Sequence, residues 1–260
     1  MTVNVKTNNN TKALVEPDNI SNPNLLINPD FKINQRGKNS YSSTKDNYTV
    51  DRWKLYNSTL TSNSDKTITL KNITHGVMGT VSQPLENIVD TPCIISAYVV
   101  DFSGECYILS ADSVGDKVTK KGLITVNCKE CKKVSIGVKD GFITLKYVKL
   151  EKGTVATPFI EPDRATEMLK CQRFFQRTYL MATFYGISGQ TYHIPIDIPV
   201  NMRIEPTFKK DIKYSYNIVN DDGLIYQKSI SCVQYYFYLQ AQNSNQCAFE
   251  CILSIDAEIY

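Results

Sequence analysis

The chain has 260 residues, of which 42% are hydrophobic, enough for the core of one large β domain or two smaller ones. Its 29 basic and 26 acidic residues nearly balance, and no run of lysine or arginine is long enough to predict a nucleic-acid-binding tract. The apolar runs have about the length of a strand, too short for a membrane-spanning helix.

Residues 1–23 are polar and rich in asparagine, which predicts a flexible leader or attachment arm rather than a packed element. They contain no apolar core of the kind that a secretory signal has. We therefore expect the eight cysteines to be reduced thiols of a protein that is made in a cytoplasm.

Cys128 and Cys131 form a CxxC pair, the sharpest cysteine pattern in the sequence. A structural zinc site needs four ligands, usually from two such pairs. The other close pair, Cys247 and Cys251, lies far along the chain in a strand-like context. We therefore expect ordinary thiols, no metal and no cofactor.

Residues 24–160 contain many short segments that are β-branched or alternate between apolar and polar side chains, separated by turn residues. Examples are "KTITLKN", "TPCIISAYVVDF" and "GFITLKYVKLEKG". Trp53, the single tryptophan, lies in an alternating frame with Leu55. This pattern predicts an antiparallel β-sandwich rather than alternating βα units.

The period changes after Pro162, where Asp163 is placed to cap a short helix within residues 161–177. One face of that helix carries Ala165, Met168, Leu169, Gln172 and Phe175. The stripe has two interpretations: it packs against a sandwich face, or copies of it meet in an oligomer.

Residues 178–260 are β again, with six predicted strands and most of the tyrosines. In "VQYYFYLQ", Tyr235 and Phe237 face one way, whereas Tyr236 and Tyr238 face the other. A strand that is aromatic on both faces in a small domain predicts a subunit interface.

Five pieces of the sequence occur in an order that is shared with one family. "YVKLEKGTVATPF", followed by "CQRFFQR", resembles a segment of bacteriophage tail fibre and receptor-binding proteins. "NLLINPDFKINQRG" and "YTVDRW" are similar to the opening of those proteins, and "IDIPVNMRIEPTF" and "SIDAEIY" to their end. The resemblance runs from Asn24 to Tyr260, although Pro29 and Asn34 stand where the family usually has glycine and often has tryptophan.

The resemblance implies a jelly roll like a carbohydrate-binding module over residues 24–160, then the short helix, then a β domain over residues 178–260 that trimerises. The trimer interface would contain Ala165, Met168, Leu169, Gln172, Phe175, Tyr236 and Tyr238. Related jelly rolls sometimes hold calcium beside the opening turn, where Asp30 could serve. Lys146 and Lys149 disfavour that ion, so we expect no metal.

No catalytic motif is recognisable in the sequence. A glycosidase needs two carboxylates held across a cleft, and no such pair can be assigned. His75 and His193 are interpreted as structural or solvent-exposed. We therefore expect no enzyme, although a depolymerase assembled across a trimer interface stays open.

Sugars bind to aromatic faces and to planar polar side chains. By that criterion the candidate glycan-binding residues are Tyr41, Tyr48, Asp51, Arg52 and Trp53. The alternative interpretation makes Trp53 a core residue, Asp51 and Arg52 an ion pair at a strand edge, and the two tyrosines ordinary loop residues.

The resulting hypothesis is a non-catalytic receptor-binding protein of a virion tail, or of a tail-like bacteriocin, assembled in the bacterial cytoplasm. It would bind a bacterial surface polysaccharide as a homotrimer and join other tail or baseplate proteins through residues 1–23. Neither nucleic acid nor membrane insertion is expected. The alternatives are a purely structural tail or baseplate component and, third, a secreted carbohydrate-binding module.

Overall fold

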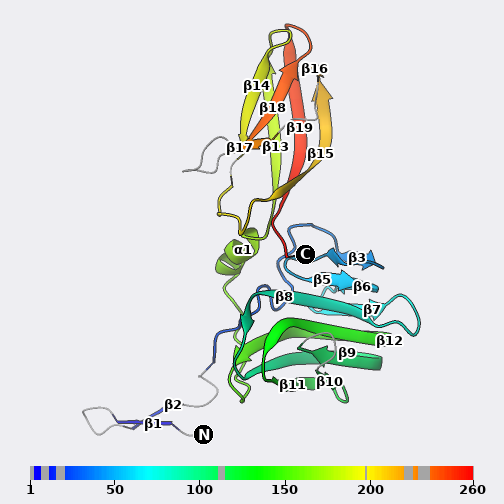
Figure 1. Ribbon diagram of the computed structural model, residues 1–260, viewed down its shortest axis with the longest axis vertical. Helices are drawn as coiled ribbons and strands as arrows, with labels where there is room; N and C mark the ends of the chain where they lie inside the picture. Colours follow the sequence, from blue (N-terminus) through cyan, green and yellow to red (C-terminus); the bar gives the residue numbers. More distant parts are fainter. Residues whose placement is uncertain are drawn as a thin grey trace. The chain divides into compact units, whose positions relative to one another are not determined.

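The computed structural model describes residues 3–6, 12–15, 21–110, 115–196, 198–219, 225–227 and 235–259. The chain divides into two compact units, Met1–Met168 and Leu169–Tyr260, and the division lies within the predicted linker of residues 161–177. Figure 1 shows that strands dominate both units and that one short helix, α1, is drawn. The prediction that the chain is built mainly from β-strands is therefore confirmed. No helix in the described ranges is long and apolar enough to cross a membrane.

The leader contains a strand pair that the sequence analysis did not predict. β1 (Val3–Lys6) pairs antiparallel with β2 (Lys12–Val15), with Val3 opposite Val15. Both segments carry β-branched or aliphatic residues, which suit extended pairing. The strand pair is an element that the sequence analysis did not expect, and the attachment role of residues 1–23 stays a prediction.

The first unit is built on a sheet of ten antiparallel strands. Along its main path the order is β3-β6-β7-β12-β8-β5-β4, and β9 pairs with β10, β11 and β12. The two longest strands, β9 and β12, run side by side over most of their length (Figure 1). The strands are β3 Ser40–Ser43, β4 Asn47–Tyr48, β5 Lys54–Tyr56, β6 Ser58–Ser62, β7 Ile68–Asn72, β8 Gly79–Val89, β9 Cys93–Leu109, β10 Gly115–Lys117, β11 Gly122–Cys128 and β12 Cys131–Lys152.

The core of this unit follows from the alternation of its strands. In β11, for example, Ile124, Val126 and Cys128 are buried, and the residues between them are exposed. Trp53 joins this core: its ring lies 4.4 Å from that of Phe31, centroid to centroid. Its indole N–H donates to the backbone oxygen of Asn28 at 2.8 Å, so the one polar atom of the ring is satisfied.

Helix α1 (Arg164–Gln172) begins where the sequence predicts. Asp163 Oδ1 accepts the backbone N–H of Thr166 at 2.8 Å, the hydrogen bond of an N-cap. That bond holds the pKa of Asp163 below its usual value. The helix ends at Gln172, so the predicted inclusion of Phe175 is wrong: Phe175 is buried and begins the next strand.

Of the other predicted stripe residues, Ala165 and Leu169 are exposed, whereas Met168 and Gln172 are half-buried. Two of the five predicted stripe residues are thus exposed. The oligomer interpretation stays a prediction, because a single chain is described.

The second unit has two antiparallel sheets. The first has the order β13-β19-β15, and the second the order β14-β18-β16 with β17 also pairing with β18. Phe237 and Phe249 lie between the sheets with ring centroids 5.0 Å apart, and both are fully buried. The strands are β13 Phe175–Tyr185, β14 Thr191–Ile196, β15 Thr207–Tyr216, β16 Ile218–Val219, β17 Ile225–Gln227, β18 Tyr235–Ala241 and β19 Gln246–Asp256.

In β18 the predicted alternation is present. Tyr235 and Phe237 are both buried in the core of this unit. Tyr238 is half-buried, and its ring meets that of His193 edge-on at 4.3 Å. The side chain of Tyr236, also predicted at the trimer interface, lies outside the described residues.

A candidate binding pocket in the first unit

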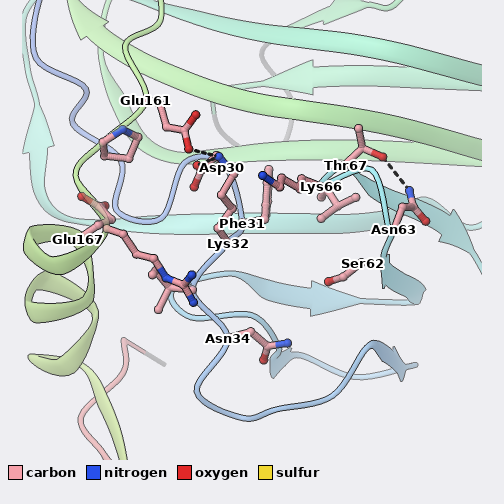
Figure 2. A pocket seen from close by; sticks show the side chains of 14 residues that line it. Asp30, Phe31, Lys32, Asn34, Ser62, Asn63, Lys66, Thr67, Glu161 and Glu167 are labelled. Carbon is pink, nitrogen blue, oxygen red and sulfur yellow. Dashed lines mark hydrogen bonds and ion pairs between the residues drawn. The ribbon is translucent and has the colours of Figure 1, made fainter.

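A pocket of about 400 Å³ opens beside the first turn of the β unit. Three segments that are far apart in the sequence form its walls: the turn at residues 30–34, the β6–β7 turn at residues 62–68, and residues 161–167 (Figure 2). Its lining residues are Asp30, Phe31, Lys32, Ile33, Asn34, Ser62, Asn63, Lys66, Thr67, Ile68, Glu161, Pro162, Arg164 and Glu167.

The first wall is a turn that the fully buried Asn28 holds in place. Its amide donates to the backbone oxygens of Ile33 at 2.8 Å and Asp51 at 3.0 Å, and its Oδ1 accepts the N–H of Ile33 at 2.9 Å. Asn28 and Phe31 have positive φ angles of 54° and 60°, a region that side chains other than glycine rarely adopt. Such backbone persists where the surroundings determine it, and it clusters at functional sites.

Lys32 lies between two acids of the pocket. Its Nζ is 2.8 Å from Asp30 Oδ2 and also contacts Glu161 Oε1. Burial alone would lower the pKa of Lys32, but the hydrogen bonds to Asp30 and Glu161 outweigh it, and the pKa is raised. The hydrogen bond from Lys32 lowers the pKa of Glu161, so this carboxylate is held ionised.

The third segment is fastened to the first by Glu167. This side chain is 2% exposed, and its Oε1 accepts the backbone N–H of Asn28 at 2.6 Å. The first turn of α1 thereby closes one side of the pocket.

The β6–β7 turn forms the remaining wall. Asn63 donates its amide hydrogens to Thr67 Oγ1 and Thr69 Oγ1, both at 2.9 Å. Asp65 accepts from the hydroxyl of Thr67 at 2.6 Å and from its N–H at 3.1 Å. These bonds lower the pKa of Asp65. Lys66 has a positive φ of 66°, fixed by this tight turn.

The pocket combines an apolar lining with charged and amide groups. Phe31, Ile33, Ile68 and Pro162 supply the apolar part. Pockets of this size and mixed character suit a small polar ligand that must be oriented by a few hydrogen bonds.

The five residues predicted to bind glycan lie elsewhere, in the interior. All five are at most 9% exposed: Tyr41, Tyr48, Asp51, Arg52 and Trp53. The expectation that Tyr41 and Tyr48 face solvent is wrong, because both rings are buried. The hydroxyl of Tyr41 donates to Asn34 Oδ1, and burial raises the pKa of Tyr41.

The polar members of that set have structural partners. Asp51 accepts from the N–H of Gln35 at 3.0 Å and from Arg36 Nη1 at 3.3 Å. Arg52 donates to the backbone oxygen of Pro84 at 2.8 Å. These hydrogen bonds and the burial of Asp51 give both residues a structural role, and Asp51 holds the turn beside the pocket in place.

The side chains that the sequence offers for metal binding or catalysis have structural partners or lie apart from one another. Asp30 is bound to Lys32, and within the described ranges no three His, Cys, Asp or Glu side chains gather as metal ligands do. Lys149 is buried and lies 3.1 Å from Glu151. His75 is exposed, with Nδ1 2.7 Å from Asp140 Oδ1, and His193 packs on Tyr238.

Sequence reasoning missed most of this pocket. The segment "NPDFKIN" carries part of the family resemblance, and Asp30 is a possible calcium ligand, but neither indicates a partnership with residues 62–68 or 161–167. The tight turn "NSDKT" at residues 63–67 is the signal that could have been pursued, since Asn and Asp there form local side-chain hydrogen bonds.

Comparison with known proteins adds little to this geometry. No family model and no curated protein matches the chain. Among solved structures, discoidin II from Dictyostelium discoideum is similar over 89% of this chain and 92% of its own, with 11% identity and a TM-score of 0.23. Vicilin from Corylus avellana (hazelnut) is similar over 84% and 86%, with 8% identity and a TM-score of 0.16. Neither TM-score is high enough to carry an argument about fold or function.

Proposed function

We propose that the protein is a non-catalytic receptor-binding component of a phage tail, or of a tail-like bacteriocin, and that it recognises a bacterial surface glycan as a trimer. In this proposal the first unit is a jelly roll of the carbohydrate-binding kind, and α1 links it to a trimerising second unit. The family resemblance from Asn24 to Tyr260 motivates the assignment.

The observation that carries the proposal is the pocket formed by residues 30–34, 62–68 and 161–167. Its apolar lining suits the C–H face of a sugar ring, and its amide, hydroxyl and charged groups suit sugar hydroxyls. Both acids that face Lys32 are tied to it, which favours binding over acid–base chemistry.

Support for a trimer comes from one face of the sheet β13-β19-β15. The residues of this face, here called the tyrosine face, are Tyr179, Met181, Tyr185, Tyr214 and Tyr216. Their exposed fractions run from 49% to 71%, and the register places Met181 and Tyr214 on either side of Glu250. Exposed apolar patches of this kind mark interaction sites, and three linked weak sugar sites would gain from effective concentration.

The test is retention of the full-length protein on surface polysaccharides prepared from a panel of Gram-positive and Gram-negative bacteria. We expect at least one preparation to retain it, with no release of reducing ends during incubation. Trimer formation without retention on any preparation would favour the purely structural alternative. Release of reducing ends would favour a depolymerase.

A further inference from the structure

The charged side chains that line the pocket differ in whether they have a partner within the protein. Three acids face it, and each has a partner: Asp30 and Glu161 bind Lys32, and Glu167 accepts the N–H of Asn28. Lys32 is paired through its contacts with Asp30 and Glu161. All three acids of the pocket and one of its three cations therefore form hydrogen bonds within the protein.

Two other cations on the walls of the pocket differ from Lys32 in this respect. Within the part of the chain that the structure describes, neither the Lys66 ammonium nor the Arg164 guanidinium makes an ion pair or hydrogen bond. The neighbouring carboxylates accept hydrogen bonds from other groups: Asp65 from the hydroxyl of Thr67, and Asp163 from the N–H of Thr166. The two cations come from different walls, one from the β6–β7 turn and one from the start of the helix.

The field of Lys66 reaches the pocket. Its charge helps to lower the pKa of Glu161 across the opening, although less than Lys32 does, and Lys146 adds to the same positive field. The positive φ of Lys66 and the bond from its N–H to the Asn63 oxygen at 3.2 Å fix the backbone that carries this side chain (Figure 2).

Two neutral side chains in the same wall as Lys66 can also form further hydrogen bonds. In the described residues Ser62 Oγ makes no hydrogen bond, and the amide of Asn63 uses its hydrogens on Thr67 and Thr69 while its oxygen accepts none. Together they offer one hydroxyl and one acceptor for sugar hydroxyl groups.

We propose that this pocket binds a saccharide that carries an anionic group, a carboxylate or a phosphate, with Lys66 and Arg164 as its counter-charges and Ser62 and Asn63 as partners of neighbouring hydroxyls. The proposal rests on the function proposed above and names the class of glycan. Arginine and lysine bind carboxylate and phosphate through charge-assisted hydrogen bonds, about twice as strong as neutral ones.

The experiment measures binding of full-length protein by titration calorimetry and on an array that holds neutral, uronic-acid and phosphodiester-linked saccharides. The Lys66→Gln/Arg164→Gln variant removes both charges. The matched control, Lys120→Gln/Lys129→Gln, removes two exposed lysine charges outside the pocket lining. Ser62→Leu fills the pocket without changing its charge. Circular dichroism and melting temperature establish that each variant is folded.

We expect an anionic class to bind, and the Lys66/Arg164 variant to bind it at least tenfold more weakly, whereas the control stays within twofold. Raising salt from 50 to 500 mM should also weaken this binding. The uronic-acid and phosphodiester arms identify the source of the charge. Ser62→Leu should weaken binding as well, which places the ligand in the pocket.

Preference for neutral saccharides, or anionic binding that the Lys66/Arg164 variant leaves unchanged, would overturn this inference and leave the proposed function standing. Binding to none of the saccharides and none of the polysaccharide preparations would overturn both.

Discussion

Both units of the chain have aromatic residues in their cores, but they differ in how many exposed aromatic side chains gather on one sheet face. In the first unit the rings of Trp53, Tyr41 and Tyr48 are buried, and the pocket combines apolar, amide and charged groups. In the second unit the tyrosine face leaves aromatic rings on the outside of the sheet, half or more exposed. A pocket with a mixed lining suits a small ligand that is oriented by a few polar groups, and an exposed aromatic face suits contact with another protein surface.

The largest expected effect tests whether the aromatic residues of the first unit are core. Trp53→Ala should destabilise this unit by about 3–5 kcal/mol, because it removes a fully buried ring and leaves a cavity. Tyr56→Ala, at a side chain that is 42% exposed, should change stability by less than about 1 kcal/mol. Urea unfolding followed by tyrosine fluorescence and circular dichroism measures both. Equal small effects would mean that Trp53 is not a core residue.

A buried ion pair is a second feature that distinguishes the interior of the first unit. Lys149 pairs with Glu151 and donates to Thr157 Oγ1 at 2.6 Å and to the Pro158 oxygen at 3.0 Å. Lys149→Ala should cost about 3–5 kcal/mol, since it leaves a buried carboxylate without its counter-charge.

Lys117→Ala is the matched control, because Lys117 forms an exposed pair with Glu105. Because solvent screens this exposed pair, its loss should change stability far less than Lys149→Ala does. The same urea titration compares the two, and a Lys149 variant as stable as the Lys117 variant would contradict a structural role for the buried pair.

The tyrosine face is tested by mass in solution. Light scattering on the full chain at micromolar concentration should give about three times its 29.4 kDa mass. Tyr179→Glu/Met181→Glu should lower the mass toward one chain, because two carboxylates then face the partner surface. Leu123→Glu, on an exposed strand position of the first unit, should not. A wild-type chain that is monomeric would refute the trimer and the role of this face.

The smallest expected effect concerns the thiols. Burial raises the pKa of Cys93 and Cys106 to about 11 and that of Cys131 to about 12. In the folded chain these thiols should therefore resist iodoacetamide at pH 8 and react once guanidinium unfolds it. Rapid alkylation of the folded chain would show that they are accessible.

The same pKa shifts predict how stability depends on pH. Above pH 9 the unfolded chain loses these protons before the folded chain does, so the contribution of the thiols is intact below pH 9 and declines from about pH 9 to 12. Urea midpoints measured from pH 8 to pH 10.5 check this, and a midpoint that rises over that range would contradict the sign.

Local sequence signals predicted a good part of the fold. Alternating β-branched segments predicted the strands of both units, Asp163 predicted the start of α1, and "VQYYFYLQ" predicted that Tyr235 and Phe237 share a face. Each of these features depends on residues that are close together in the sequence. The spacing of apolar and polar residues is therefore enough to predict them.

The site could not be predicted in the same way. Its walls join residues 30–34 to residues 161–167, and no local pattern states which distant turns meet. Tyr41 and Tyr48 look like loop tyrosines in the sequence and are buried by tertiary packing alone. The sequence indicates only that Lys149 disfavours calcium. That Lys149 is buried and paired with Glu151 becomes apparent only from the three-dimensional structure.

The central claim is that the first unit recognises a surface glycan through the pocket of residues 30–34, 62–68 and 161–167. The most direct measurement compares full-length wild type and Ser62→Leu for retention on the bacterial polysaccharide panel, with Leu123→Glu as a surface control. The account predicts retention of wild type and of the control, and at least tenfold weaker retention of Ser62→Leu. Equal retention of all three proteins, or of none, would contradict it.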